Sequence, residues 1–421
     1  MAVEEIVVGR DPDDMKKYGK KGCIFLGKHI VGKGSDFHLT NPVLMDVLRP
    51  HIVLVTGKRG QGKSYSAAII AEEIMKLPDD IKSNLSCLMI DTMGIFWSMK
   101  NPNDNDLLLL NKWGMKPLGF NVKNIVPVGL VDFYDKAGIA YDGTFSIKPS
   151  ELSAADWALT FNIDIFEPLG ILLERTLKKL SGNYSIEDII DEIEKDSRTD
   201  NKDKMALENR FVSAKGWGIF SDKATPIEEF LEPGGTAILD VSLQEWNVRN
   251  LMVGILSREV YQARVSARRQ EELAVIGGED VKKVPMTWII MDEVHNFIPD
   301  DGVTAATKDM LTLIKQGRQP GISLVLITQR PNKLHGDAIS QSDMVISHRL
   351  TAKPDLDALS AVMQTYLLFD IRKSISSLPR LKGAAVVLDD NSERLFNIQV
   401  RPRQSWHAGA SPVAIKEKSV Y

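Results

Sequence analysis

Short apolar runs alternate with longer amphipathic stretches along most of the chain. The apolar runs predict buried strands at residues 52–55, 86–91, 235–241, 288–291, 323–327 and 344–347, and a final hairpin at 384–388 and 396–400. Apolar positions at helical spacing predict helices over residues 67–76, 250–272 and 305–316, and another that begins at Pro354. Because strands and helices alternate, we predict an α/β fold with a mainly parallel sheet and helices on both faces.

The pattern changes in two regions of the chain. Residues 1 to about 20 are polar and predict a mobile arm, and the glycine-broken apolar runs after them predict a small β-element within residues 1–50. Residues 103–232 have few β-branched runs and carry two apolar stripes at helical spacing, so we predict a mainly helical insertion. The expected nucleotide-binding core therefore comprises residues 51–102 and 233–402, followed by a polar tail at 403–421.

Composition narrows the class of protein. A length of 421 residues favours two or three domains, and 43% hydrophobic with 26% charged residues is ordinary for a globular protein. The net charge of −4 excludes a global basic field but leaves room for a local ring of basic side chains. Cys23 and Cys87 offer no disulfide framework, and neither a signal peptide nor a membrane span is evident. We expect a cytoplasmic protein with no membrane partner.

A glycine-rich loop lies between the strand at 52–55 and the helix at 67–76. Its sequence, Gly-Lys-Arg-Gly-Gln-Gly-Lys-Ser, matches the P-loop pattern G-x-x-x-x-G-K-[ST] in the required strand–loop–helix context. Glycines let backbone N–H groups turn towards phosphate oxygens, and the helix N-terminus adds free amides. Lys63 would neutralise the β- and γ-phosphates of ATP, and Ser64 would bind Mg²⁺. The predicted nucleotide-binding residues are Gly57, Lys58, Arg59, Gly60, Gln61, Gly62, Lys63, Ser64 and Tyr65.

Two adjacent acids, Asp292 and Glu293, end the apolar run at 288–291. A carboxylate at this position is expected to hold Mg²⁺ directly or through water, which assigns Asp292. The neighbouring Glu293 is placed to polarise the attacking water as general base. Acids at a strand end are common, and the P-loop upstream makes the catalytic interpretation the stronger one.

Two further residues extend the candidate catalytic set. Gln329 follows the strand at 323–327, where an amide can hydrogen-bond both a γ-phosphate oxygen and water. Arg318 follows the helix at 305–316; it fits equally an arginine finger that acts on a neighbouring subunit and a cation at a helix C-terminus.

Other charged residues have a structural interpretation beside the functional one. Asp91 ends the strand at 86–91, where a ligand-side carboxylate and a loop-capping aspartate are equally consistent. Four arginines on the helix at 250–272 fit a solvated face better than a phosphate-binding surface; they are Arg258, Arg264, Arg268 and Arg269. The chain lacks a correctly placed ABC-transporter signature and the N-K-x-D order of GTPases, so neither class is supported.

With these residues in place, the chain resembles the HerA branch of the HerA/FtsK superfamily of P-loop translocases. The resemblance spans residues 51 to about 402 and combines the P-loop with three further segments. These are Met-Asp-Glu-Val-His-Asn-Phe at 291–297, Gly-Arg-Gln-Pro-Gly-Ile at 317–322 and Ile-Thr-Gln-Arg-Pro-Asn at 327–332.

That resemblance implies a RecA-like core of the ASCE type that assembles as a homo-hexameric ring, hydrolyses ATP between subunits and moves double-stranded DNA. It favours Arg318 as the arginine finger and Gln329 as the γ-phosphate sensor. HerA relatives pair with a nuclease such as NurA or with a defence effector. They also carry a larger N-terminal β-barrel, whereas only about 50 residues precede the P-loop here. We therefore expect a reduced barrel, which leaves the nuclease pairing open.

Three functions remain compatible with the sequence. The first is a ring motor that translocates along or unwinds double-stranded DNA in DNA processing, repair or defence. The second is a packaging, conjugation or secretion-type ATPase. The third is a nucleotide-dependent scaffold that activates a nuclease or another effector.

Overall fold

The computed structural model describes residues 4–32, 36–277, 284–363 and 371–409. The described strands are β1 (Ile6–Val8), β2 (Cys23–Val31), β3 (His38–Asp46), β4 (Ile52–Thr56), β5 (Leu85–Asp91), β6 (Val122–Pro127), β7 (Gly143–Phe145), β8 (Thr236–Asp240), β9 (Met286–Met291), β10 (Ile322–Thr328), β11 (Met344–His348), β12 (Ala384–Asp389) and β13 (Arg394–Val400). They form one sheet of order β1-β3-β2-β13-β12-β11-β4-β10-β9-β5-β8-β6-β7. The α/β prediction is confirmed.

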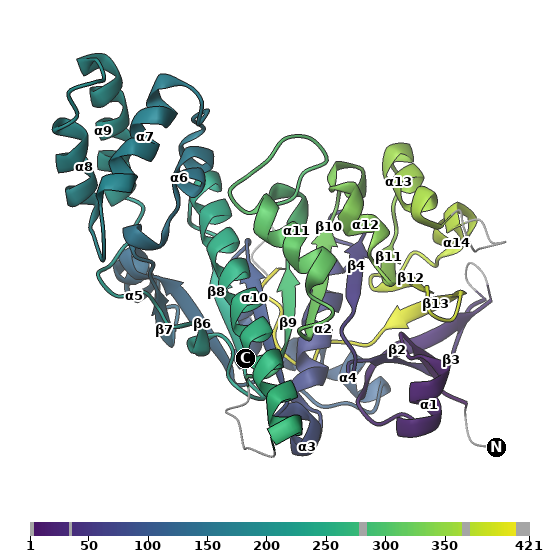
Figure 1. Ribbon diagram of the computed structural model, residues 1–421. Coiled ribbons are helices and arrows are strands. Elements are labelled where there is room, and N and C mark those ends of the chain that lie inside the picture. The colour runs from purple at the N-terminus through teal and green to yellow at the C-terminus, as the bar shows by residue number, and fades with distance from the viewer. Residues whose placement is uncertain (1–3, 33–35, 278–283, 364–370, 410–421) are drawn as a thin grey trace.

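The described helices connect and cover these strands (Figure 1). They are α1 (Pro12–Tyr18), α2 (Lys63–Met75), α3 (Asp79–Lys82), α4 (Leu107–Lys112), α5 (Val131–Ala137), α6 (Ala154–Phe161), α7 (Pro168–Lys179), α8 (Ile186–Glu194), α9 (Asn201–Lys215), α10 (Trp246–Gly277), α11 (Thr307–Gln316), α12 (Gly336–Ser340), α13 (Lys353–Met363) and α14 (Ile371–Ser377). No helix among the described residues is both long and apolar enough to cross a lipid bilayer.

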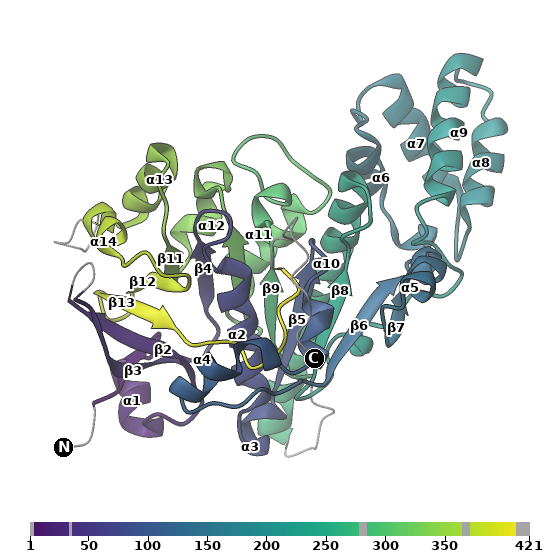
Figure 2. The same ribbon diagram turned by 180° about the vertical axis from the view of Figure 1, so that it is seen from behind.

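The central strands are parallel and buried on both faces. From β11 through β4, β10, β9, β5, β8 and β6 to β7, each neighbouring pair is parallel. Alternate side chains of β4 therefore serve two cores: Val53 and Val55 pack with α2, whereas Leu54 packs with the cluster that contains α10 and α11. Figures 1 and 2 show α10 and α11 on one face of the sheet and α2 on the other.

The N-terminal element is part of the same sheet, because β2 pairs antiparallel with β13. The predicted hairpin is present as β2 and β3, but the predicted mobile arm is wrong for the described residues before it. Ile6–Val8 pairs with β3, and α1 follows. Arg10 forms a buried ion pair with Asp46, which anchors a segment whose polar sequence indicated solvent exposure.

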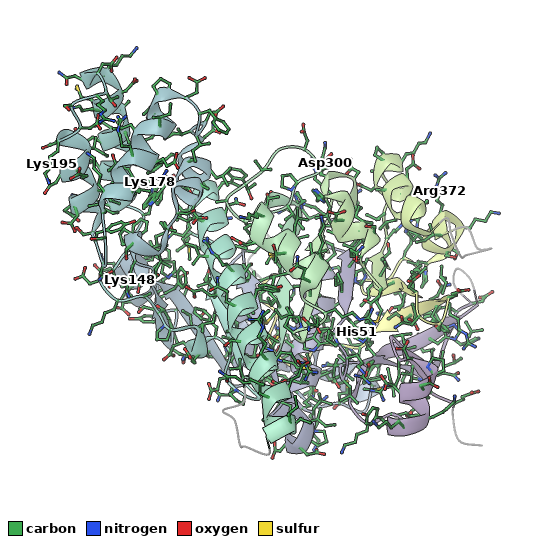
Figure 3. The ribbon with its side chains drawn as sticks, viewed as in Figure 1. His51, Lys148, Lys178, Lys195, Asp300 and Arg372 are labelled. Carbon is green, nitrogen blue, oxygen red and sulfur yellow. The ribbon has the colours of Figure 1, made fainter. Side chains whose placement is uncertain are left out.

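A buried histidine joins this element to the core. His51 Nδ1 lies 2.7 Å from Asp343 Oδ2, and its Nε2 lies 3.3 Å from Asp46 Oδ2. Figure 3 shows His51 at the end of the core sheet that faces the N-terminal element. Burial alone would lower the pKa of His51, but the hydrogen bonds to the two carboxylates outweigh burial and raise it to about 9.

The region predicted as a helical insertion also contains two strands. Residues 122–127 and 143–145 form β6 and β7, which extend the core sheet beyond β8. β7 was missed because it has only three residues, and β6 because it gains its hydrogen bonds from β8, which is remote in the sequence. Helices α6–α9 form a separate lobe, seen at the upper left of Figure 1. The expected capping pair is present at α8, where Ser185 and Asp188 bond reciprocally.

Residues 401–405, where the predicted core ends and the predicted polar tail begins, lie in the interior. Arg401 and Arg403 are buried beside Glu72 of α2, with Arg401 Nη2 2.8 Å from Glu72 Oε2. The backbone N–H of Ser405 also donates to Glu72 Oε1, at 3.1 Å. This charge compensation explains why a polar segment is buried, and it ties residues 401–405 to the helix that follows the P-loop. The remainder of the tail, 410–421, lies outside the described residues.

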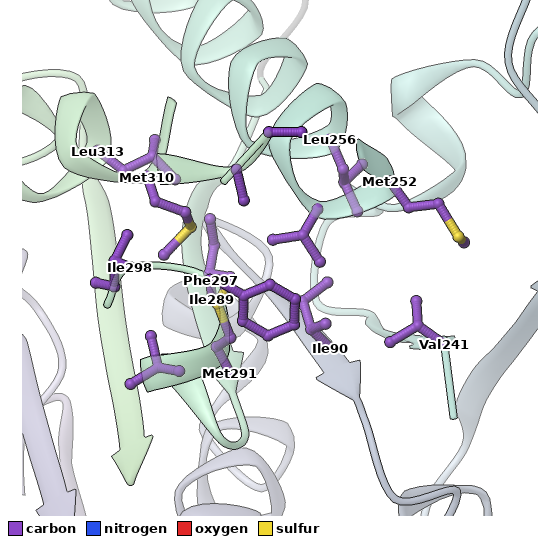
Figure 4. Packing of buried hydrophobic residues seen from close by; sticks show 14 of the residues in the cluster. Ile90, Val241, Met252, Leu256, Ile289, Met291, Phe297, Ile298, Met310 and Leu313 are labelled. Carbon is purple, nitrogen blue, oxygen red and sulfur yellow. The ribbon is translucent and has the colours of Figure 1, made fainter. Parts of the chain in front are cut away.

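An apolar cluster supports the end of β9. Phe297 lies among Ile289 and Met291 of β9 and side chains of α10 and α11, which include Leu256 and Met310 (Figure 4). All five side chains are buried. The cluster fixes the backbone on both sides of Asp292 and Glu293.

Candidate active site

The P-loop spans the carboxyl end of β4 and the N-terminus of α2. Gly62 has φ of 110° as the N-cap of α2, a conformation that side chains disfavour. Gly57 lies against His348 of β11, and a Cβ added to Gly57 would come within 2.6 Å of the His348 Cβ. These two glycines allow the loop to turn sharply and to lie close to the neighbouring strand.

Backbone hydrogen bonds hold the loop to two neighbouring segments. The N–H of Lys58 donates to the carbonyl of Arg349 at 3.0 Å, and the N–H of Gly383 donates to the carbonyl of Gln61 at 3.3 Å. The segments after β11 and before β12 therefore form one wall of the P-loop.

His348 of β11 packs against the P-loop, a role that was not predicted from the sequence. Its Nδ1 lies 3.1 Å from the carbonyl of Ala384, which can only accept, so Nδ1 carries the proton. Nε2 then accepts from the Ser66 hydroxyl at 2.9 Å. Burial lowers the pKa of His348 to about 4, so the ring is neutral at physiological pH. The available signal was a polar residue at the end of the predicted strand 344–347.

Lys63 is buried at the start of α2, with 7% of its surface exposed. Among the described residues its ammonium makes a single hydrogen bond, a long contact of 3.5 Å to the carbonyl of Lys58. Burial lowers the pKa of Lys63, and the nearby charges of Glu293 and Asp292 oppose this shift. A buried ammonium with spare donors is suited to bind phosphate oxygens.

Ser64 and Asp292 meet directly across the site. The Ser64 hydroxyl donates to Asp292 Oδ2 at 2.7 Å, and Oδ1 accepts the N–H of Glu293 at 2.8 Å. Burial raises the pKa of Asp292, and the Ser64 hydrogen bond opposes this shift. The structure thus brings the two predicted metal ligands together.

This donor set fits Mg²⁺. Both residues present hard oxygen atoms, and Mg²⁺ usually takes one or two protein oxygens together with waters and phosphate oxygens. Within the described ranges there is no group of three or more His, Cys, Asp or Glu side chains suited to hold a metal by themselves. Ser64 and Asp292 would therefore hold the ion jointly with a bound phosphate, and the ion would offset phosphate charge.

Glu293 occupies a strained position at the end of β9. Its φ is 48°, a left-handed conformation that is uncommon for a residue with a side chain. Burial and the neighbouring Asp292 raise the pKa of Glu293 to about 7, whereas a backbone hydrogen bond from Gln329 lowers it. The strained backbone turns the carboxylate towards Lys63 and β10.

A second polar pair lies beside Glu293 and was not assigned from the sequence. His295 Nδ1 is 3.5 Å from Glu293 Oε2 and 3.0 Å from Thr328 Oγ1. Thr328 Oγ1 also accepts the backbone N–H of Arg330 at 3.0 Å. These contacts link the acidic end of β9 to the turn that carries Gln329. The His295 position was visible in the sequence as part of Asp-Glu-Val-His but had no assigned role.

Arg318 lies far from the P-loop of its own chain. It precedes β10, whose opposite end, Thr328, pairs with Thr56 beside the P-loop. Its side chain is exposed and has no hydrogen bond or ion pair within the described part of the chain. The site residues Lys63, Ser64, Asp292, Glu293 and Gln329 of one chain therefore lie together at the carboxyl ends of the central strands. Arg318 lies at the opposite, amino end of β10.

Three other candidate residues have structural contacts. Asp91 caps its loop by accepting four backbone N–H groups, from residues 93–96, at 2.7–3.1 Å. The hydroxyl of Tyr65 accepts the backbone N–H of Arg403 at 2.6 Å. Arg264 contradicts the predicted solvated face, because it is 1% exposed and donates to the carbonyl of Pro320 at 2.8 Å.

Comparisons with known proteins identify the family of the chain. The family model described as the central domain of helicase HerA matches residues 24–260. The chain is 27% identical over 175 residues to the DNA double-strand break repair helicase HerA of Pyrococcus furiosus, covering 38% of this chain and 31% of that protein. It is 19% identical over 408 residues to the protein of the same name from Sulfurisphaera tokodaii, covering 96% and 74%. The chain thus spans less than a third of the Pyrococcus protein.

Among solved structures, VirB4 of Thermoanaerobacter pseudethanolicus has a similar fold. The TM-score is 0.54 at 12% identity, and the match covers 90% of this chain and 97% of that chain. At this identity the match supports the fold alone.

Proposed function

The chain belongs to the family of the HerA helicase central domain, and from this membership we propose that it is an ATP-hydrolysing motor that moves along double-stranded DNA. Membership of the P-loop ATPase superfamily is established by the family model and the fold. The names of the Pyrococcus and Sulfurisphaera relatives support a role in DNA repair or processing. A cytoplasmic location is part of the proposal.

The contact between Ser64 and Asp292 carries the catalytic part of the proposal. It joins a hydroxyl and a carboxylate, both oxygen ligands of the kind that Mg²⁺ prefers, and together with the buried ammonium of Lys63 it supports a site for Mg²⁺ and a triphosphate. Glu293 follows immediately and is the group placed to take a proton from the attacking water. Gln329 follows Thr328 at the end of the neighbouring strand β10, and Thr328 Oγ1 lies 3.0 Å from His295, whose ring is 3.5 Å from Glu293; this position supports its role as a γ-phosphate sensor.

The position of Arg318 supports a site that is completed by a second subunit. Its exposed guanidinium cannot reach the P-loop of its own chain. Arg318 precedes the amino end of β10, whereas the P-loop follows the carboxyl end of the neighbouring strand β4. In a homo-hexameric ring, the same side chain would reach the γ-phosphate of the adjacent subunit. Such arginines contribute about 10³–10⁵-fold in rate.

The proposed motor would grip DNA through its phosphates, which makes binding independent of sequence and sensitive to salt. The experiment is to measure steady-state ATP hydrolysis with and without double-stranded DNA at two salt concentrations. Stimulation by DNA that weakens at high salt supports the proposal. A rate that responds to a nuclease or another protein partner but not to DNA contradicts it and favours the activator function.

A further inference from the structure

One carboxylate oxygen of the proposed base Glu293 lacks a hydrogen bond. Oε2 is buried, and no donor within the described part of the chain bonds it. The polar atom that approaches it is Nδ1 of His295, at 3.5 Å, slightly beyond an ordinary hydrogen bond. Buried polar atoms without a partner are rare in folded proteins, so this oxygen calls for a functional explanation.

His295 bridges the ends of two strands. It lies on a single 3-10 turn, Val294–Asn296, directly after Glu293 at the end of β9. Nδ1 of its ring is also 3.0 Å from the hydroxyl oxygen of Thr328, the last residue of β10. The side chain of His295 is 11% exposed and Thr328 is buried, so water competes little for these contacts.

The proposed chemistry of Glu293 determines which ring nitrogen of His295 carries the proton. A general base reacts as an ionised carboxylate, and an ionised carboxylate only accepts hydrogen bonds. Nδ1 must then carry the proton, which it shares between Glu293 Oε2 and Thr328 Oγ1. Thr328 Oγ1 has a second lone pair, which accepts the backbone N–H of Arg330 at 3.0 Å. The donors and acceptors of this group therefore match.

The Thr328 hydroxyl also shapes the turn that carries Gln329. Its bond to the N–H of Arg330 closes a tight turn over residues 328–330. In the sheet, Thr328 pairs with Thr56, the residue that leads into the P-loop. One hydroxyl thus contacts both the turn of the proposed γ-phosphate sensor and the histidine beside the base.

We propose that His295 is a positioning residue that holds the Glu293 carboxylate in its reactive orientation. Through Thr328 it also joins this carboxylate to the turn that carries Gln329. Hydrogen bonds of catalytic groups often tighten when substrate binds, so the 3.5 Å separation should shorten in the ATP complex. The role rests on the proposed hydrolysis of ATP but not on movement along DNA.

The test compares turnover with nucleotide binding in the full chain. His295→Leu fills similar space without a donor, whereas His295→Asn places an amide N–H near the position of Nδ1. Thr328→Val removes the hydroxyl and keeps the branched shape. The control, His38→Leu, replaces an exposed histidine of β3, which lies far from β4 in the sheet order.

Four properties are measured for each variant. They are kcat and KM of ATP hydrolysis, the affinity for Mg·AMPPNP by isothermal titration calorimetry, and folding by circular dichroism. His295→Leu should lower kcat by about 10–100-fold, because a misplacement of about 1 Å can cost about 100-fold. KM and the affinity for Mg·AMPPNP should change little, since the contact serves turnover and not binding.

Two further variants separate positioning from a purely structural role. His295→Asn should recover most of the turnover that His295→Leu loses. Thr328→Val should also lower kcat, and adding it to His295→Leu should cause little further loss, because the two side chains act as a unit.

The role of His295 is overturned by a wild-type kcat in His295→Leu, or by an effect on KM or Mg·AMPPNP affinity alone. It is also overturned if His295→Asn or the control is as slow as His295→Leu. Additive losses in the double variant overturn the link through Thr328. A wild type that hydrolyses no ATP contradicts the proposed function and this role with it. A wild type that hydrolyses ATP without moving on DNA contradicts the motor and leaves the role of His295 standing.

Discussion

Ser64 donates a hydrogen bond of 2.7 Å to Asp292, although the two residues lie 228 positions apart in the sequence. The contact joins the first turn of α2 to the end of β9. In the sheet, β10 lies between β9 and β4, the strand that leads into the P-loop and α2. Neither residue alone defines a metal site. Their proximity marks the place where Mg²⁺ would bind, and it connects the phosphate loop to the adjacent general base.

Removing the Ser64 hydroxyl tests this relationship. Ser64→Ala should lower the affinity for Mg²⁺ in the presence of ATP, and the hydrolysis rate, by about 10–100-fold, because one oxygen ligand is lost. The measurement is the rate of hydrolysis as a function of Mg²⁺ concentration. Ser213→Ala, which removes an exposed hydroxyl on α9, is the matched control. A Mg²⁺ dependence like that of the wild type would remove Ser64 from the metal site.

Arg318 should act on the neighbouring subunit. Arg318→Ala and Lys63→Ala should each abolish most hydrolysis, but mixing the two proteins should restore part of it. With equal amounts, about one interface in four combines an intact P-loop with an intact Arg318. Native mass measurement in the presence of ATP and DNA verifies that mixed rings form. Mixed rings without any recovered activity would rule out action between subunits.

The buried carboxylate of Glu72 should be essential to the fold. It faces Arg401 and Arg403, both at 0% exposure, and accepts the N–H groups of Gln404 and Ser405. Glu72→Gln leaves Arg403 without its carboxylate and Arg401 with Glu73 alone, so the free energy of unfolding should fall by about 3–5 kcal/mol. Chemical denaturation measures this loss.

The control for Glu72 is an exposed ion pair of the helical lobe. Glu174 lies 2.6 Å from Lys178 at i,i+4 spacing; the Lys178 side chain is largely exposed and the Glu174 side chain about half exposed. Glu174→Gln should change stability little, because solvent screens such pairs. Equal effects of the two substitutions would show that the buried cluster does not hold residues 401–405 on α2.

His51 should make the stability of the fold depend on alkaline pH. Its pKa is raised from 6.5 to about 9 because it bonds Asp343 and Asp46, the latter also paired with Arg10. The folded state favours protonated His51. Its contribution to the free energy of unfolding is therefore fully present below pH 6.5 and is lost as pH rises through about 9. At about 1.4 kcal/mol per pKa unit, the loss amounts to roughly 3 kcal/mol.

The check for His51 is chemical denaturation at a series of pH values from 6 to 10. The wild type should lose stability over this interval, and His51→Gln, which cannot be protonated, should show a flatter profile. Parallel profiles of the two proteins would mean that the charge of His51 does not join the N-terminal element to the core.

Local patterns in the sequence predicted the central sheet and the residues around the P-loop. Signals such as Lys63-Ser64 and Asp292-Glu293 depend on neighbours in the chain, so they are readable without the fold. The same is true of the Ser185–Asp188 capping pair, which needs only one helical turn.

Features that depend on distant partners were missed. Strands β1 and β7 have three residues each and exist because β3 and β6 supply their hydrogen bonds. Arg264 and Arg403 read as solvated charges, yet both are buried, because remote carbonyls and carboxylates compensate them. His348 was overlooked because its role depends on the contact with Ser66, 282 residues away. The spacing of apolar residues along the sequence does not show that a charged side chain will be paired with a remote group in the fold.

The central claim is that ATP hydrolysis moves this protein along double-stranded DNA. A triplex-displacement assay tests it directly, because a third strand on a duplex is released by a protein that translocates, whether or not the duplex is unwound. We expect ATP-dependent release by the wild type and none by Glu293→Gln, which should still bind ATP while its turnover falls by about 10²–10⁴-fold. Hydrolysis of ATP by the wild type without any release of the third strand would contradict the account.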